Sequence, residues 1–162
     1  MSLSDFFDPT RSWEPAAGPA PDPIGFQISG LPFGAPLESA RFLGRPDVFE
    51  WKSRLEKEYT LLYASRGLRL RFQGGLLNEV SYLIAQDSCS HASFTPSRPM
   101  APDGTRLTPD MDRARIVAIF GEPDPEGSDE ETLQVFHGGV AISDFQIDEH
   151  GHLREWDLYA DD

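Results

Sequence analysis

Hydrophobic and polar residues alternate along two stretches of the chain, and this period of two predicts antiparallel β-strands. Leu68, Leu70 and Phe72 would point to one face of such a strand, while the intervening arginines point to the other. The following Gln73-Gly74-Gly75 predicts a hairpin turn, because glycine adopts the positive φ angles that tight hairpins need. The predicted strands are residues 59–64, 68–72 and 76–85 in the first stretch, and 132–137, 140–142 and 153–159 in the second.

A segment with apolar residues at intervals of three comes before each stretch and predicts a helix. The two apolar stripes consist of Leu37, Ala40 and Leu43, and of Ala114, Val117 and Phe120. Both segments end in Gly-x-Pro-Asp, at residues 44–47 and 121–124, and glycine followed by proline is a common helix stop.

Two further predictions concern helices. Thr108 is the expected N-cap of the second helix, with Pro109 at its first position. A short additional helix is expected between Phe49 and Tyr59, where Trp51 and Leu55 lie four positions apart.

The same order of elements therefore occurs twice, and Phe120 lies 77 positions after Leu43. Insertions confined to loops, with the elements kept, are typical of a duplicated unit. We expect an α+β fold of two tandem repeats, each a helix followed by a three-stranded antiparallel meander, with both helices on one face of the sheet. The expected organisation is a Pro-rich tail (1–23), a first repeat (24–85), a linker (86–107) and a second repeat (108–162), with 24–162 forming one compact domain.

This tandem pattern resembles the β-lactamase inhibitor protein family and the small outer-membrane assembly lipoproteins that share its unit. The positions that carry the resemblance are Gly44, Pro46, Gly67, Gly121, Pro123, Gly139 and the hairpin patterns. In that family the face of the sheet holds a protein partner and there is no catalysis, so the resemblance implies a binding protein. By type, the chain is also similar to bacterial immunity proteins, which are small binders that neutralise toxins.

Charge is distributed unevenly along the chain, whose net charge is −13. Residues 96–162 contain 16 acidic and 5 basic side chains, whereas residues 1–95 have a net charge of only −2. Such a half repels nucleic acid, which requires clustered Lys and Arg, and attracts a basic protein. An alternative is that the acidity only maintains solubility.

Five carboxylates lie close together between the second helix and the next strand, and we expect them to contact a basic partner. They are Asp124, Glu126, Asp129, Glu130 and Glu131. The alternatives are a solvated acidic loop and a calcium site, although the spacing matches no EF-hand loop.

Strand alternation predicts one outward face that combines charged and aromatic side chains, a composition suited to partner binding. Its members are Arg69, Arg71, Glu79, Gln134, Phe136, Glu155, Asp157 and Tyr159. Glu79 and Glu155 also suggest a paired-carboxylate hydrolase, but duplicated surface glutamates are the favoured explanation. An alternative for Phe136 and Tyr159 is that aromatic residues of the tail, Phe6, Phe7 or Trp13, cover them. We expect these tail residues to dock on their own domain and not on a partner.

No other chemistry is indicated, and we expect no cofactor and no metal. His150 and His152 lack a second cluster with zinc-ligand spacing, and Cys89 with His91 is too isolated to indicate a thiol nucleophile. One cysteine, no signal sequence and no long apolar run predict a cytoplasmic protein without a membrane span. The expected function is non-catalytic binding of a basic protein, of the immunity or antitoxin kind. The alternatives are a chaperone or adaptor for a secreted protein, or a small enzyme with an unrecognised pocket.

Overall fold

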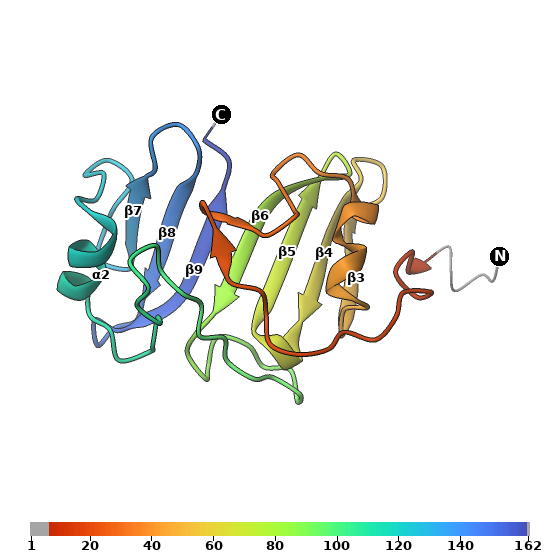
Figure 1. Cartoon of the computed structure of the whole chain (residues 1–162), viewed down its shortest axis with the longest axis horizontal. Helices are drawn as coiled ribbons and strands as arrows, with labels where there is room; N and C mark the ends of the chain where they lie inside the picture. Colours follow the sequence, from red (N-terminus) through yellow and green to blue (C-terminus); the bar gives the residue numbers. More distant parts are fainter. Residues whose placement is uncertain (1–6, 162) are drawn as a thin grey trace.

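A computed structural model describes residues 7–161 and consists mainly of one seven-stranded antiparallel sheet, in the order β3-β4-β5-β6-β9-β8-β7 (Figure 1). Its strands are β3 (Val48–Ser53), β4 (Glu58–Tyr63), β5 (Leu68–Gln73), β6 (Leu76–Leu83), β7 (Thr132–Phe136), β8 (Ile142–Ile147) and β9 (Leu153–Tyr159). A two-stranded hairpin, β1 (Pro23–Ile24) and β2 (Gln27–Ile28), precedes them. Five of the six predicted strands are present, and the prediction of antiparallel pairing is confirmed. The predicted strand 140–142 is misplaced, because β8 begins at Ile142 and continues to Ile147.

The two halves of the chain meet at the centre of the sheet, where β6 pairs with β9. Val80 lies opposite Leu158, and Tyr82 lies opposite Trp156. These four side chains are buried on the same face, so the hydrophobic core is continuous from one half to the other. Because strand side chains alternate, this register sends Glu79, Ser81 and their partners on β9 to the opposite face.

One face of the sheet is covered by the remaining elements (Figure 1). They are the 3₁₀ helix η1 (Leu37–Leu43), the β1–β2 hairpin, the segment between β6 and β7, and the α-helix α2 (Arg113–Phe120). A short 3₁₀ turn, η2 (Ala64–Arg66), joins β4 to β5. Most of the other face is not covered by these elements, although Ser88 and Cys89 lie at one end of it, beside Arg69 and the buried Leu83.

The predicted α+β fold of two helix-plus-three-strand repeats is wrong. The described chain is mostly β: its first half contributes four strands to the sheet and its second half contributes three. The extra strand is β3, which lies where a helix was expected between Phe49 and Tyr59. Phe49 and Trp51 form a stacked and edge-on aromatic cluster with Tyr59 of the neighbouring strand, and Leu55 is 95% exposed in the intervening turn. Aromatic packing across strands therefore outweighs the four-residue spacing of Trp51 and Leu55.

The first predicted helix forms only as the 3₁₀ segment η1. Its buried residues Ala40 and Leu43 are three positions apart. A strict interval of three matches the 3.0 residues per turn of a 3₁₀ helix, in which residues i and i+3 are eclipsed. Gly44 follows with a φ of 81°, and its N–H donates to the Arg41 carbonyl to end the segment.

The second predicted helix is α2, but it begins later than expected. Its N-cap is Asp112, whose side chain accepts a hydrogen bond from the Arg115 N–H at 2.9 Å, and not Thr108. Ile116 is its buried residue, and Val117 and Phe120 of the predicted stripe pack against the core, while Ala114 is exposed. The predicted stripe therefore identifies the side of the helix that faces the sheet only in part.

The N-terminal segment is part of the packed structure. Trp13 is 5% exposed and belongs to the core, and Thr10 is fully buried with its N–H and hydroxyl bound to the Asp8 carboxylate. Trp51 Nε1 donates to the Phe7 carbonyl at 2.9 Å. Phe6, which was also considered for docking, lies outside the described residues.

Candidate functional site

The uncovered face of the sheet holds eight of the thirteen predicted binding residues. Strand register places its central side chains in one row, composed of Leu62, Arg69, Ser81, Asp157, Asp144 and Gln134. A parallel row is composed of Thr60, Arg71, Glu79, Tyr159, Ile142 and Phe136. We call this surface the open face.

Arg69 is the centre of a polar network on the open face. Its Nη2 donates to Ser81 Oγ at 3.0 Å and forms an ion pair with Glu155. The same nitrogen lies 3.8 Å from Asp157 Oδ1. A cation from β5 therefore joins two carboxylates from β9 across the intervening strand β6.

A second ion pair extends the network toward the edge of the sheet. Arg71 Nη1 lies 3.2 Å from Glu79 Oε2, and Ser81 Oγ donates to the other oxygen of Glu79 at 3.2 Å. Burial, together with the charge of Asp157, raises the pKa of Glu79 above its ordinary value, although both arginines oppose this. The predicted residues Arg69, Arg71, Glu79, Glu155 and Asp157 are thus parts of one connected cluster.

Asp157 is the most perturbed carboxyl group of the open face. Its side chain is 13% exposed, and its Oδ1 is buried without a hydrogen-bond partner among the described residues. Burial and the adjacent Glu155 carboxylate raise its pKa to about 7. Burial thus disfavours the charged form of Asp157, which lies beside the Glu155 carboxylate in the same cluster.

A separate hydrogen-bonded triad fixes the other side of the face. Gln134 Nε2 donates to Tyr159 OH at 2.7 Å and to Asp144 Oδ1 at 3.0 Å. The Tyr159 hydroxyl in turn donates to Asp144 Oδ2 at 2.9 Å, and burial raises the pKa of this phenol. Each member comes from a different strand, so the triad holds β7, β8 and β9 in a rigid arrangement.

Carboxylates outnumber cations on the open face by six to three. The carboxylates are Glu50, Glu58, Glu79, Asp144, Glu155 and Asp157, and the cations are Lys52, Arg69 and Arg71. All three cations lie within 4.0 Å of a carboxylate. The excess charge is therefore negative, and the pairing holds several side chains in fixed positions.

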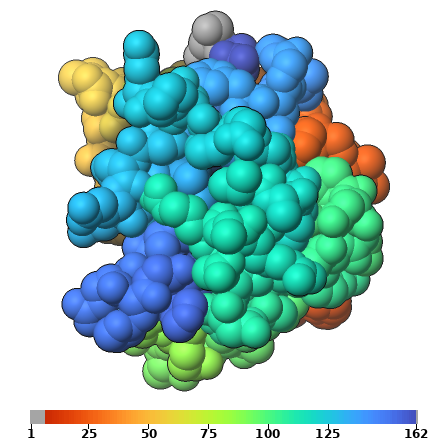
Figure 2. All heavy atoms as spheres, turned by 90° about the vertical axis from the view of Figure 1, so that its left-hand side faces the viewer, coloured from red at the N-terminus to blue at the C-terminus, as the bar shows by residue number. Residues whose placement is uncertain are grey.

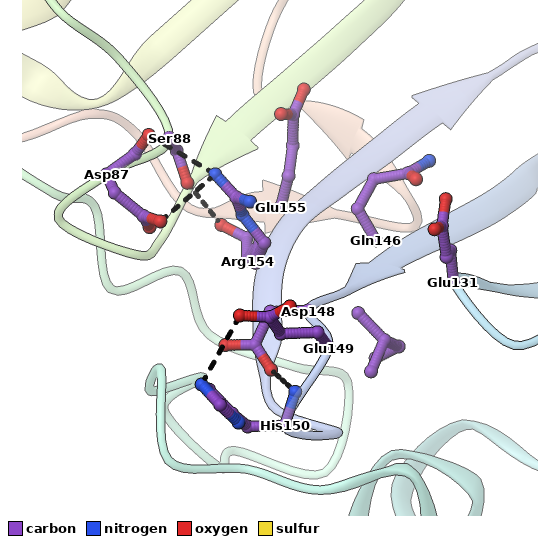
Figure 3. Close-up of a pocket in the computed structure, with 10 residues that line it drawn as sticks. Asp87, Ser88, Glu131, Gln146, Asp148, Glu149, His150, Arg154 and Glu155 are labelled. Atoms are coloured by element: carbon purple, nitrogen blue, oxygen red, sulfur yellow. Dashed lines mark hydrogen bonds and ion pairs between the residues drawn. The ribbon is translucent and has the colours of Figure 1, made fainter.

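An acidic notch of about 540 Å³ lies at one end of the open face. Five carboxylates line it, namely Asp87, Glu131, Asp148, Glu149 and Glu155. Figure 3 shows Gln146 and Glu155 on the paired strands β8 and β9, with Glu131, the residue before β7, next to them. The blue turn between β8 and β9, which forms one wall, projects from the surface in Figure 2.

Two of the five notch carboxylates are paired with arginines of the protein itself, Asp87 with Arg154 at 3.4 Å and Glu155 with Arg69. His150 Nε2 lies 3.6 Å from Glu149 on an exposed turn, which leaves Glu131 and Asp148 without an arginine or lysine partner among the described residues. Asp148 accepts hydrogen bonds from the backbone N–H groups of His150 and His152, both at 2.9 Å, and these bonds lower its pKa. The notch thus remains acidic and suits an incoming Lys or Arg side chain.

The predicted acidic segment has two parts with different surroundings. Asp124 accepts from the Gly127 N–H and Asp129 from the Glu131 and Thr132 N–H groups, so these carboxylates fold the loop itself. The loop also binds the edge strand β7, because the Asp124 N–H donates to the Gln134 carbonyl at 2.7 Å. Glu126, Glu130 and Glu131 are exposed, and among these Glu131 lines the notch.

Sequence reasoning missed Ser81, Asp144, Gln146 and the notch residues Asp87, Asp148 and Arg154. Asp144 and Gln146 were missed because the strand was expected to end at Ile142, whereas β8 begins there. Extending the alternation by four residues would have found both. Asp87 and Arg154 are brought together only by the pairing of β6 with β9, which no local pattern encodes.

Trp13 does not cover Phe136 or Tyr159, because it is buried in the core on the other face of the sheet. Phe136 is 48% exposed and lies beside Ile142 on the open face. It therefore adds apolar area next to the triad, at a distance along the sheet from the Arg69 cluster.

Within residues 7–161, no group of three or more His, Cys, Asp and Glu side chains is arranged to hold a metal ion. Glu79 and Glu155 lie on the same face but belong to different rows, opposite Tyr159 and Leu83 respectively. No helix of the described chain is long and apolar enough to cross a membrane.

Comparisons of the chain with protein-family models, with curated proteins and with solved structures give no match.

Proposed function

We propose that this protein is a non-catalytic binding protein whose open face holds a basic protein partner. The observation that supports this most strongly is the acidic notch next to a face of side chains already fixed by ion pairs and hydrogen bonds. Fixed side chains lose little conformational entropy on binding, and such preorganisation improves affinity. The excess of carboxylates steers a basic surface toward the face and sets its orientation.

In this proposal the partner inserts a Lys or Arg side chain into the notch. Its remaining contacts spread over the Arg69 cluster and the triad, with Phe136 supplying apolar area. The partner is inhibited because the seven-stranded sheet covers its functional surface, the mode implied by the resemblance to inhibitor and immunity proteins. Inhibition by occlusion requires no chemistry from the bound protein.

The experiment compares two charge-matched variants with the wild type. Glu131→Gln/Glu149→Gln removes two exposed carboxylates from the notch, and Glu14→Gln/Glu122→Gln removes two exposed carboxylates elsewhere. Each immobilised protein captures partners from source lysate at low salt, and a salt step releases them for identification. The activity of the released partner is then measured with and without the protein.

The expected result is one basic partner, captured in stoichiometric amount by the wild type and by the control pair. Loss of two charge-assisted contacts should weaken its binding to the notch variant by tenfold or more, on the order expected for such bonds. A partner that binds the notch variant as tightly as the wild type, or that resists salt release, would contradict the proposed site. A partner that remains fully active in the complex would contradict inhibition.

A further inference from the structure

A second cavity, of about 380 Å³, lies on the covered side of the sheet. Three separate parts of the chain form it: the N-terminal segment around Pro19, the η2 turn and the segment around Ser97. Figure 1 shows the first and last of these segments running on the same side of the sheet. We call this cavity the arginine pocket.

The charge of the arginine pocket is opposite to that of the protein as a whole. Arg66, Arg98 and Arg106 line it, and Asp22 is its single carboxylate. Three of the 14 cationic side chains thus meet in one cavity of a chain with net charge −13. Asp22 is already bound, because its Oδ1 accepts from Arg106 at 2.6 Å and from the Met100 N–H at 2.9 Å.

Arg66 is a buried cation that lacks an ion-pair partner among the described residues. It is 9% exposed, and its Nη1 and Nη2 donate to the Leu43 and Pro19 carbonyls, both at 2.8 Å. Its Nε is buried and has no hydrogen-bond partner in the part of the chain that the structure describes. Burial lowers the pKa of this guanidinium, which reflects the cost of removing its charge from water.

Arg98 leaves further donors at the mouth of the pocket. Its hydrogen bonds within residues 7–161 both come from Nη1, to the Ile84 and Ser97 carbonyls at 2.7 Å. A guanidinium has five N–H donors in a planar fork, and the fork fits a carboxylate or phosphate. Nη2 and Nε of Arg98 therefore remain for a ligand at the exposed rim.

The other walls are mainly apolar and rigid. They include Pro19, Ala20 and Pro96, and the fully buried Tyr82 next to them donates a hydroxyl hydrogen bond to the Pro21 carbonyl at 2.8 Å. A mostly apolar pocket with a few placed polar groups is the usual form of a small-molecule site, and its volume lies within the common range.

From these observations we infer that the arginine pocket binds a small organic anion, with a carboxylate or phosphate head against the arginines and a flat apolar body against the proline and alanine walls. The site lies on the side opposite the open face, so it does not depend on the proposed protein partner. An anion there would supply the counter-charge that Arg66 and Arg98 lack among the described residues, since Asp22 already pairs with Arg106.

Phenyl phosphate is the test probe, because it combines a phosphate head with a flat apolar body. Inorganic phosphate and phenol serve as the two half-probes. Binding is measured by isothermal titration calorimetry, and the site is located from the amide ¹H–¹⁵N shifts of Ser65, Thr95 and Ser97. We expect phenyl phosphate to bind at one site, to shift these amides, and to bind at least tenfold more tightly than either half-probe.

Arg98→Gln and Arg106→Gln are the site variants, and Arg41→Gln is the control. Arg41 is exposed and pairs with Glu38 on η1, so the control removes one paired surface cation outside the pocket. Each site variant should weaken binding by about tenfold, the expected effect of a lost charge-assisted bond, while the control leaves it unchanged. Arg66 is left intact because it also holds two backbone carbonyls.

The inference fails if phenyl phosphate does not bind the wild type, or if it shifts amides outside the pocket. It also fails if inorganic phosphate binds as tightly as phenyl phosphate, because the apolar walls would then contribute nothing. Equal weakening by Arg41→Gln would show general charge attraction instead of a site. Circular dichroism and thermal unfolding of each variant confirm that the fold is retained, so that lost binding is not lost structure.

Discussion

The backbone of Ser97 lies against Gly67 so closely that a Cβ added at residue 67 would be 2.4 Å from the Ser97 nitrogen. Gly67 also has a φ of 62°, and its carbonyl accepts from the Leu83 N–H at 2.8 Å. The Ser97 N–H in turn donates to the Leu83 carbonyl at 2.8 Å. Glycine at this position lets the segment after β6 fold back onto the sheet, where it forms one wall of the arginine pocket.

Gly67→Ala should therefore destabilise the protein by more than backbone strain alone. Gly74→Ala is the matched control, because Gly74 has nearly the same φ, 61°, and open space around it. Left-handed strain costs roughly 1–2 kcal/mol, so we expect about that loss for Gly74→Ala and about 2 kcal/mol more for Gly67→Ala. Urea unfolding of both variants measures the difference. Equal losses would show that the segment after β6 can move away from residue 67 without a loss of stability.

Asp157→Asn should stabilise the folded protein at pH 8. The native pKa of Asp157, about 7, is above its ordinary value of 3.8, so between these pH values the native state binds more protons than the unfolded chain. Stability should consequently fall as pH rises through this window, by up to about 4 kcal/mol. Asn keeps the shape of the side chain without the buried charge.

Unfolding free energies at pH 4 and pH 8 test this prediction. The variant should show a smaller fall between the two pH values than the wild type. Asp103→Asn is the control: hydrogen bonds from Thr105 lower the pKa of that exposed carboxyl below 3.8, so its removal should leave the fall between pH 4 and pH 8 nearly unchanged. If the Asp157→Asn variant were less stable than the wild type at pH 8, the attraction between the Asp157 carboxylate and Arg69 would exceed the cost of burying that carboxylate.

His137 should make the protein less stable in mild acid. Its ring stacks on Phe26 with centroids 3.6 Å apart, its Nε2 lies 2.7 Å from Ser143 Oγ, and burial lowers its pKa from 6.5 to about 4. The unfolded chain therefore takes up a proton between pH 6.5 and 4 that the native state does not. Because the ring is partly exposed, we expect a loss of roughly 1–2 kcal/mol across this window.

Thermal unfolding of His137→Gln at pH 7 and pH 4.5 checks this expectation. The variant should lose less stability on acidification than the wild type does. His152→Gln, at an exposed position, should retain the full loss. A wild-type protein with the same stability at both pH values would refute the prediction.

Alternation predicted the strands well because it is a local signal tied directly to burial. Leu68, Leu70 and Phe72 are all buried, as the pattern indicated. Helical spacing was less reliable, because stripes of three or four residues also occur in 3₁₀ segments and strands, as at Leu43 and Trp51. The likeness of the two halves consequently suggested a repeat of helices that the structure does not contain.

The candidate site was predictable only in part, for a related reason. Alternation placed Arg69 and Asp157 on an outward face, and they do lie on the same face of one sheet. Their closeness, however, depends on the register of β6 against β9, which joins residues more than 70 positions apart. Neither the notch nor the arginine pocket follows from local pattern, since each forms from segments distant in the sequence.

The N-terminal segment should contribute to stability as part of the core. Trp13 is 5% exposed, its N–H donates to the Thr10 carbonyl at 2.9 Å, and the Asp8 carboxylate holds Thr10 in place. Trp13→Ala should lower the free energy of unfolding by about 3–5 kcal/mol, as for other large buried aromatic side chains. Phe7→Ala is the control, because Phe7 is 49% exposed and its carbonyl, which binds Trp51, is kept. Urea unfolding should show a loss below about 1 kcal/mol for this control. If Trp13→Ala cost no more than Phe7→Ala, the segment would be attached to the sheet without supporting it.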